Sequence, residues 1–140
     1  MPFVQCYASQ VNQVLMNILS NAIDAVEEKQ NKIQSGVLQE ECFVPTIEIQ
    51  TTCLEKERVQ IKISDNGIGM PQDVIEKIYD PFYTTKPIGK GTGLGLAIAY
   101  QIMHDCHEGI LQCSSGVGKG TTFILEIPCH PQTAPLLQNV

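Results

Sequence analysis

Residues 9–29 place apolar side chains at every third or fourth position, which is typical of a helix with one buried face. Ser9 stands where the N-cap of such a helix is expected. The opposite side is rich in amides rather than in lysine and glutamate. Its residues are Gln10, Gln13, Asn17, Asn21, Asp24 and Glu28. At about 100° per residue they fall within about 40° of one line, so this helix presents a polar stripe.

Four short strands are expected, in two pairs. Apolar and polar residues alternate strictly in 47–51 and in 59–63, and residues 54–57 form the turn between them. The second pair, 110–113 and 123–127, is joined by a glycine-rich connection. Alternation gives a strand one covered and one wet face, which predicts a sheet with helices on a single side.

The remaining segments are interpreted as loops and two further helices. Residues 31–45 predict a loop of variable structure. Pro71, at the first helical position, opens a short helix with an apolar face that ends before Pro81. Residues 80–92 have no periodicity and predict an irregular, mobile segment. A longer helix is expected over residues 93–106.

At 140 residues the chain has the size of one domain, which we expect to span residues 1–128 and to be followed by a flexible tail at 129–140. Its composition is 43% hydrophobic, without an apolar run near the roughly 20 residues that cross a bilayer. The first residues carry no secretory signal, so we expect a cytoplasmic domain without membrane contact. The elements predict an α+β fold, a two-layer α/β sandwich whose sheet is mixed but mostly antiparallel and carries helices on one face.

Charge and cysteine content exclude several classes of partner. A net charge of −6 opposes binding to nucleic acid, which requires clustered lysine and arginine. The six cysteines form no Cys-x-x-Cys pair and are interpreted as reduced thiols. His104 and His107 flank Cys106 at a spacing that zinc could use. No second ligand pair follows, so the polar end of a helix is the favoured interpretation.

Four islands of polar and glycine residues carry the candidate chemistry. In the first, Asn17 and Asn21 lie one helical turn apart and project toward one ligand. Amide oxygens suit a hard cation such as Mg²⁺, with a solvated helix face as the alternative. In the second, Asp65-Asn66-Gly67-Ile68-Gly69, a carboxylate at a strand end can accept a hydrogen bond from an exocyclic amine such as adenine N6. An ordinary turn is the alternative there.

The third and fourth islands are glycine clusters. Residues 89–95 lead into the second long helix, where exposed amides and the helix dipole favour an anion such as phosphate. Neither a P-loop nor the Gly-x-Gly-x-x-Gly pattern fits, and a structural hinge is the alternative. Lys86 and Lys90 lie close enough to add positive charge to this anion site. Residues 118–122, taken alone, favour a hairpin turn.

In this fixed order the islands resemble the ATP-binding catalytic domain of sensor histidine kinases, within the gyrase, Hsp90, histidine kinase and MutL superfamily and its Bergerat-type fold. The resemblance covers about residues 10–128. The sequence boxes of that family are matched, in order, by residues 17–22, 65–69, 80–82, 91–95 and 118–121. The first strand of the family is expected to be absent from this chain.

The resemblance implies ATP and Mg²⁺ as cofactors and gives roles to single residues. Asn21 would coordinate Mg²⁺ as the metal ligand, with Asn17 near the phosphates. Asp65 would hold the adenine amine, assisted by Thr121 through water. A lid over residues 80–95, anchored by Phe82, would meet the phosphates through its glycines. The nucleotide-binding residues implied in this way are Asn17, Asn21, Asp65, Gly67, Gly69, Phe82, Lys86, Lys90, Gly91, Thr92, Gly93, Leu94, Gly95 and Thr121.

The catalytic residues implied are Asn17, Asn21 and Lys86. Lys86 replaces an arginine that follows the Phe-Tyr pair in some members of the family. Asn17 stands where the gyrase-like branch carries a glutamate as general base, and an amide cannot take a proton from water. The resemblance therefore implies phosphoryl transfer to a protein side chain rather than rapid hydrolysis.

The phosphate acceptor is expected outside this chain. The three histidines, His104, His107 and His130, all lie downstream of the glycine box at 91–95. None of them is a phosphoacceptor histidine followed by an acidic residue at the start of a dimerising helix pair. The implied partners are the dimerisation and histidine phosphotransfer domain of the parent chain and, after it, a response regulator. In isolation the domain should phosphorylate nothing. Two alternatives stay open: a serine kinase of the anti-sigma-factor type, and an ATP-sensing module without catalysis. Attachment of the parent protein to a membrane also stays open.

Overall fold

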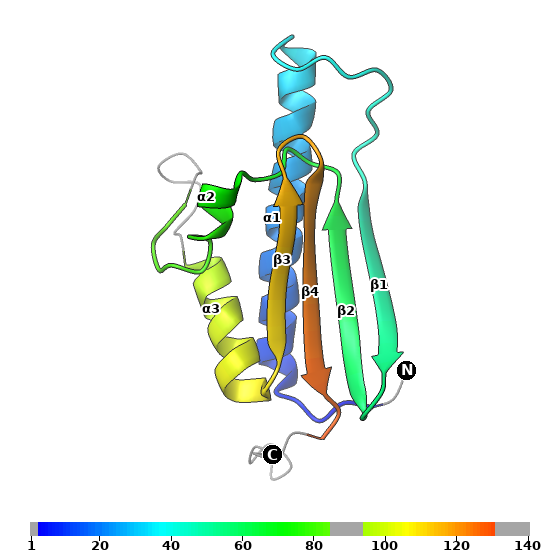
Figure 1. Cartoon of the computed structure of the whole chain (residues 1–140), viewed down its shortest axis with the longest axis vertical. Helices are drawn as coiled ribbons and strands as arrows, with labels where there is room; N and C mark the ends of the chain where they lie inside the picture. Colours follow the sequence, from blue (N-terminus) through cyan, green and yellow to red (C-terminus); the bar gives the residue numbers. More distant parts are fainter. Residues whose placement is uncertain (1–2, 85–93, 131–140) are drawn as a thin grey trace.

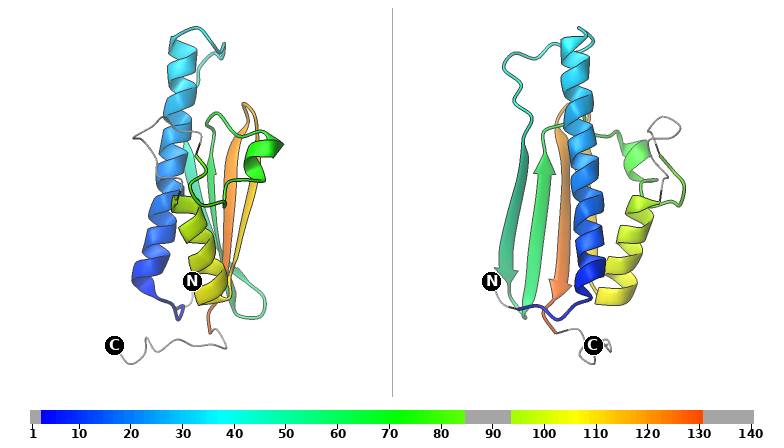
Figure 2. Two further views of the ribbon diagram at one scale, coloured as in Figure 1. Left: turned by 90° about the vertical axis from the view of Figure 1, so that its left-hand side faces the viewer. Right: turned by 180° about the vertical axis from the view of Figure 1, so that it is seen from behind.

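A four-stranded sheet with helices on one face forms the fold, and the computed structural model describes residues 3–84 and 94–130 of it. Figure 1 shows the strands side by side, and Figure 2 shows α1 and α3 on the same face of the sheet. In chain order the elements are α1 (Ala8–Gln34), β1 (Ile47–Leu54), β2 (Arg58–Asp65), α2 (Gln72–Ile75), α3 (Gly95–Gln101), the π-helix η1 (Ile102–Cys106), β3 (Ile110–Gly116) and β4 (Gly120–Pro128). The predicted two-layer α+β architecture is confirmed.

The strand order is β1-β2-β4-β3, and every neighbouring pair is antiparallel. The prediction of a mixed sheet is therefore wrong for the part of the chain that the structure describes. The register aligns Ile63 with Phe123 and Phe123 with Cys113 across three strands. Two residues further along, Asp65, Thr121 and Ser115 form the next row. Since side chains two residues apart share a face, this polar row continues the apolar, helix-covered face of the sheet.

The core forms where α1 and α3 cover the central strands. On α1 the buried positions follow the helical period, as the sequence pattern predicts. Val14 and Ile18 are fully buried, and Ile63 and Phe123 meet them from the sheet. Ala99 and Met103 close the same cluster from α3 and η1. The core is therefore a single layer between two helices and the inner face of β2, β4 and β3.

Strand β1 lies at the edge of the sheet and is covered on neither face over most of its length. Ile49 is 56% exposed although it shares a face with buried Ile63. Figure 2 shows the reason, because α1 runs over β2 and β4 and leaves β1 to one side. The expected covered face thus exists for β2 and β4 but not for β1.

Helix α1 begins and ends beyond its predicted bounds. Its first residue is Ala8 with Tyr7 as the N-cap, so the prediction of Ser9 as N-cap is wrong, and no side chain caps this end. At the other end the helix continues to Gln34, into the segment predicted as loop. The apolar pattern of the buried face ends at Val26. The next buried residue on that face is Lys29, whose charged side chain does not count as apolar in the sequence pattern.

The second long helix ends at Cys106 as predicted, but its last turn is a π-helix. His107 is buried just beyond it, and its two ring nitrogens serve the backbone. Its Nδ1 donates to the carbonyl of Ile102 at 3.0 Å, and its Nε2 accepts the Tyr7 N–H at 3.0 Å. His107 is thus a structural link between η1 and the start of α1.

The segment before α1 and the end of β4 lie together. The Gln5 N–H donates to the carbonyl of Cys129 at 2.9 Å, and the Cys129 N–H donates to the carbonyl of Glu57 at 2.8 Å. Cys129, at the start of the predicted tail, is therefore buried and hydrogen-bonded, whereas 131–140 lie outside the described residues. All six cysteines fall within the described ranges, and none of them forms a disulfide. Over those ranges no helix has the length and apolar content to cross a membrane.

Replacing Ile18 with alanine should lower the free energy of unfolding by about 2–5 kcal/mol, because it removes three carbons from a fully buried site. Urea titration measures the change, with an unaltered m-value as the sign that only the folded state is affected. Met16 lies on the same helix and is 57% exposed. Met16→Ala should change the free energy by less than about 0.5 kcal/mol. Equal losses in the two variants would contradict the packing described above.

Candidate nucleotide-binding site

A cleft of about 510 Å³ lies between α1, the turn after β2, α2, the start of α3 and the β3–β4 hairpin. This volume is in the range of small-molecule sites. Its polar side comes from the stripe of α1, including Asn17, Asn21 and Asp24. Its apolar side comes from residues around α2 and β4, which are Ile68, Met70, Val74, Ile78 and Phe123. The cleft therefore offers one wall for a flat apolar group and another for polar or charged groups.

Asp65 ends β2 and places its carboxylate at one end of the cleft. The Gly67 N–H donates to Asp65 Oδ1 at 2.8 Å. Burial raises the pKa of Asp65 above its usual value, while the backbone N–H groups of Gly67 and Thr121 lower it by a smaller amount. Backbone N–H groups thus hold the ionised carboxylate in place. Its remaining lone pairs can only accept hydrogen bonds.

The turn from Asp65 to Gly69 passes between α1 and the β3–β4 hairpin. A Cβ on Gly67 would lie 2.5 Å from the backbone carbon of Ala25, and one on Gly69 would overlap the carbonyl of Gly116. Gly69 also has a φ of 72°, which favours glycine. The Ile68 N–H donates to the Ala25 carbonyl at 3.1 Å and fixes the turn against α1. Gly67 and Gly69 therefore allow the turn to approach α1 and the hairpin closely beside the cleft.

Ser115 lies beside this turn, on the strand that pairs with β4. The Met70 N–H donates to Ser115 Oγ at 2.8 Å, and Ser115 Oγ donates to the Gly120 carbonyl at 2.9 Å. Ser115 Oγ also lies 2.7 Å from Thr121 Oγ1. Thr121 is 7% exposed and lines the cleft. Sequence reasoning did not single out Ser115, because its partners come together only through the antiparallel register.

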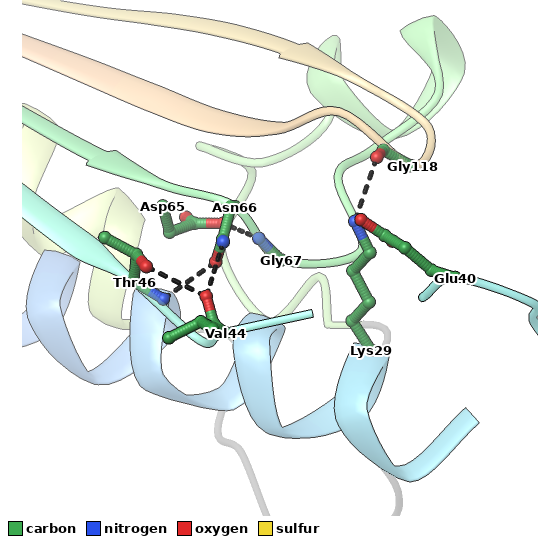
Figure 3. A network of polar contacts seen from close by, with 8 residues as sticks. All are labelled: Lys29, Glu40, Val44, Thr46, Asp65, Asn66, Gly67 and Gly118. Atoms are coloured by element: carbon green, nitrogen blue, oxygen red, sulfur yellow. Dashed lines mark hydrogen bonds and ion pairs between the residues drawn. The ribbon is translucent and has the colours of Figure 1, made fainter. Parts of the chain in front are cut away.

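Lys29 fastens three segments at the same end of the molecule (Figure 3). Only 7% of its side chain is exposed, and its Nζ lies 2.9 Å from Glu40 Oε2. The same Nζ donates to the Gly118 carbonyl at 3.2 Å and lies 4.8 Å from the centroid of the Phe43 ring. Lys29 therefore ties α1 and the segment before β1 to the hairpin turn that precedes Thr121.

Asn66 adds a second fastening between the turn and the segment before β1 (Figure 3). Its Nδ2 donates to the Val44 carbonyl at 2.8 Å, and its Oδ1 accepts the Thr46 N–H at 2.8 Å. Both the nitrogen and the oxygen of the Asn66 side-chain amide are thus hydrogen-bonded to the segment before β1. Together with the Gly67 bond to Asp65, this leaves the acidic turn little freedom to move.

Asn17 and Asn21 both reach the cleft, as predicted from their spacing. Asn17 Nδ2 donates to the Gly95 carbonyl at 3.0 Å. Asn17 therefore holds the first residue of α3, a contact that the sequence did not predict. Asn21, Asp24 and Glu28 continue the oxygen-rich stripe along the cleft. Amide and carboxylate oxygens with room for water are donors that fit Mg²⁺, and Asn21 is the predicted ligand among them.

The lid residues are only partly within the described structure. Leu94 caps α3, and Gly95 lines the cleft. Phe82 is 73% exposed with a φ of 66° and is not among the cleft-lining residues, whereas its neighbour Tyr83 is. The structure therefore does not bring Phe82 into the cleft. The predicted residues Lys86, Lys90, Gly91, Thr92 and Gly93 lie outside the described residues.

Cys113 lies beneath the polar end of the cleft and is partly buried. Burial, and then the nearby charge of Asp65, raise the pKa of Cys113 to about 11. A thiol with such a pKa stays protonated at neutral pH and is a poor nucleophile. This fits the interpretation of Cys113 as a reduced thiol.

The sequence model described as "Histidine kinase-, DNA gyrase B-, and HSP90-like ATPase" matches residues 6–131. Sporulation kinase E of Bacillus subtilis is 35% identical over 127 residues, which are 91% of this chain and 15% of that protein. The signal transduction histidine-protein kinase AtoS of Escherichia coli is 38% identical over 122 residues, which are 87% of this chain and 17% of that protein. The chain thus spans less than one fifth of these two relatives.

A solved structure of similar fold is the nucleotide-free catalytic domain of the histidine kinase ThkA. It superposes with a TM-score of 0.70 at 32% sequence identity and covers 91% of this chain and 73% of that domain. The likeness therefore covers most of this chain rather than a single motif.

Replacing Lys29 with methionine should lower the free energy of unfolding by about 1–3 kcal/mol, since the Gly118 carbonyl loses its charged donor while the apolar stem is kept. Urea denaturation of the two proteins measures the difference. Glu40 is 45% exposed at its side chain, so Glu40→Gln should cost less than about 1 kcal/mol. A loss for Glu40→Gln as large as that for Lys29→Met would show that the ion pair, not the Gly118 bond, fastens the hairpin.

Proposed function

This chain belongs to the family of histidine kinase-, DNA gyrase B- and HSP90-like ATPases, and from that membership we propose that it binds Mg-ATP and donates the γ-phosphate to a histidine on another domain of its parent protein. One observation carries the proposal most directly. The Asp65 carboxylate, held by the Gly67 N–H, stands at the end of a cleft whose opposite wall is the amide stripe of α1. An acceptor at one end and oxygen ligands along one side suit a nucleotide with its metal.

The adenine would enter the apolar part of the cleft. Ile68, Met70 and Phe123 offer apolar surface beside Asp65, where a flat base can be stripped of water. The exocyclic amine of adenine would donate to the Asp65 carboxylate, whose position the neighbouring backbone N–H already fixes. Thr121, beside Asp65 in the sheet, would complete this contact.

The phosphates would lie toward Asn17, Asn21 and the start of α3. Asn21 would hold Mg²⁺ together with water and phosphate oxygens, and the ion would neutralise phosphate charge. Asn17 would set the position of Gly95 through its side-chain amide, so that the glycine cluster before α3 reaches the phosphates. Lys86 and Lys90 would add positive charge to the same end of the nucleotide.

The neutral side chain of Asn17 favours transfer over hydrolysis. Its Nδ2 is engaged with Gly95, and its amide has no basicity with which to activate water. In the transfer step a nitrogen of the acceptor imidazole would attack the γ-phosphorus in line. The bond to the β,γ-bridging oxygen would break, and ADP would leave with that oxygen. The protein would contribute position and charge rather than a covalent partner.

The acceptor and later steps would involve other protein parts. The named relatives are sensor kinases several times longer than this chain, which supports a histidine-bearing dimerisation domain in the parent protein. A response-regulator aspartate would receive the phosphate next, in the cytoplasm. Labelled ATP supplied with a cognate histidine domain in trans tests this proposal. Transfer to histidine supports it, transfer only to serine favours a serine kinase, and tight ATP binding without transfer favours a sensing module.

Asp65→Asn should weaken ATP binding by about 10- to 100-fold, because a charged acceptor is lost. Isothermal calorimetry with and without Mg²⁺ gives the affinities. At neutral pH the free energy of unfolding of this variant should equal or exceed that of the wild type. The folded-state pKa of Asp65 is raised above 3.8, so its ionised form disfavours folding. This disadvantage should disappear as the pH falls through the folded pKa toward 3.8. Unchanged ATP affinity in Asp65→Asn would refute the proposed adenine contact.

Asn21→Ala should abolish the Mg²⁺ dependence of ATP binding and lower the rate of phosphate transfer in trans by at least about tenfold, since a first ligand of the ion is lost. Asn12 provides the control, because it is exposed on the opposite flank of α1. Asn12→Ala should behave as the wild type in both measurements. If Asn21→Ala retained its Mg²⁺ dependence, the metal would have to be bound elsewhere.

A further inference from the structure

We propose that Ser115 sets the base specificity of the cleft by fixing the hydroxyl of Thr121 as a hydrogen-bond acceptor toward the ligand. This inference rests on the proposed binding of ATP. Ser115, Thr121 and Asp65 stand in one row across β3, β4 and β2. Thr121 and Asp65 line the cleft, and Ser115 supports Thr121 from the side away from Asp65.

The direction of the bonds around Ser115 follows from a count of its hydrogens. A serine hydroxyl has one hydrogen to donate and two lone pairs that can accept. The Gly120 carbonyl, 2.9 Å away, can only accept, so in this hydrogen bond Ser115 is the donor. The Met70 N–H, 2.8 Å away, can only donate, so it occupies one lone pair of Ser115 Oγ.

One lone pair of Ser115 then remains for Thr121. The two hydroxyl oxygens are 2.7 Å apart, a normal distance for an O–H···O hydrogen bond. With the Ser115 hydrogen given to the Gly120 carbonyl, Thr121 is the donor in this bond, and this is the direction that the proposal assigns. Its own single hydrogen thus points away from the cleft, and its lone pairs are left for a ligand.

The result is an end of the cleft that accepts at two neighbouring positions. Asp65 presents a carboxylate, and Thr121 presents only lone pairs. An amino group on a purine, as at C6 of adenine, supplies the two hydrogens that this pair needs. A keto oxygen at C6, as in hypoxanthine, would face two acceptors and leave buried polar groups unpaired, which a polar site penalises strongly.

Ser115 is therefore a specificity-determining residue that acts through Thr121 and does not touch the base. In Ser115→Ala the Thr121 hydroxyl is free to rotate and to donate to a keto oxygen. The variant should then bind inosine triphosphate better relative to ATP. A residue with only a structural role would weaken both nucleotides by the same factor.

The test is the ratio of the dissociation constants for ATP and inosine triphosphate, measured by calorimetry with Mg²⁺ on the wild type and on variants that unfold cooperatively. Ser115→Ala should lower the preference for ATP by about fivefold to tenfold. Ser115→Thr keeps the hydroxyl and should restore the wild-type ratio. Thr121→Val removes the acceptor, and should weaken ATP without improving inosine triphosphate. Ser114→Ala is the matched control, since Ser114 is exposed on the other face of β3.

The outcomes separate this inference from the proposed function. A wild type that prefers ATP, with the same preference in Ser115→Ala, overturns the role of Ser115 and leaves ATP binding intact. An equal weakening of both nucleotides in Ser115→Ala also overturns it, because the hydroxyl then serves folding alone. A wild type that binds neither nucleotide refutes the proposed function and the inference together. A lowered preference in Ser115→Ala that Ser115→Thr reverses supports the assignment.

Discussion

The approach of three backbones at the acidic turn is the constraint on which the rest of the site depends. Gly67 lies against Ala25 of α1, and Gly69 lies against Gly116 at the end of β3. A Cβ on Gly120, which has a φ of 90°, would overlap the carbonyl of Asp65. The carboxylate of Asp65 therefore takes its position from main-chain packing between helix and hairpin. Side-chain bonds from Lys29 and Asn66 then hold this arrangement against separation.

The charges along the cleft explain why a nucleotide would need a cation there. Asp24, Glu28 and Asp65 line the described part of the cleft, where Lys32 is the basic residue. A polyphosphate placed beside these carboxylates would be repelled unless its own charge were reduced. A divalent ion held by amide and phosphate oxygens does this without requiring a strongly basic protein. The acidic net charge of −6 is thus compatible with a phosphate ligand, although it opposes binding to nucleic acid.

The sequence predicted the fold well where local periodicity and glycine geometry decide the structure. The strands, their turn at 54–57 and the end of the second long helix at Cys106 follow from such signals. The extent of α1 did not, because residues 30–34 carry a single apolar side chain, Ile33, and so continue no apolar pattern. The bonds from Met70 to Ser115 and from Asn17 to Gly95 were also missed, since each joins segments far apart in the chain. A mixed sheet was expected, whereas pairing in the described residues is antiparallel throughout.

The hydrogen bond between Gln5 and Cys129 has a mechanical consequence. It brings the two ends of the described fold together at the end of the sheet opposite to the β3–β4 turn (Figure 1). Neighbouring segments of a longer chain would therefore leave the domain side by side. Tension applied between these two segments would act first on the hydrogen bond between Gln5 and Cys129. The glycine-lined turn and Lys29 lie away from this contact. A domain joined in this way can be pulled or swung as one unit without its cleft being drawn open.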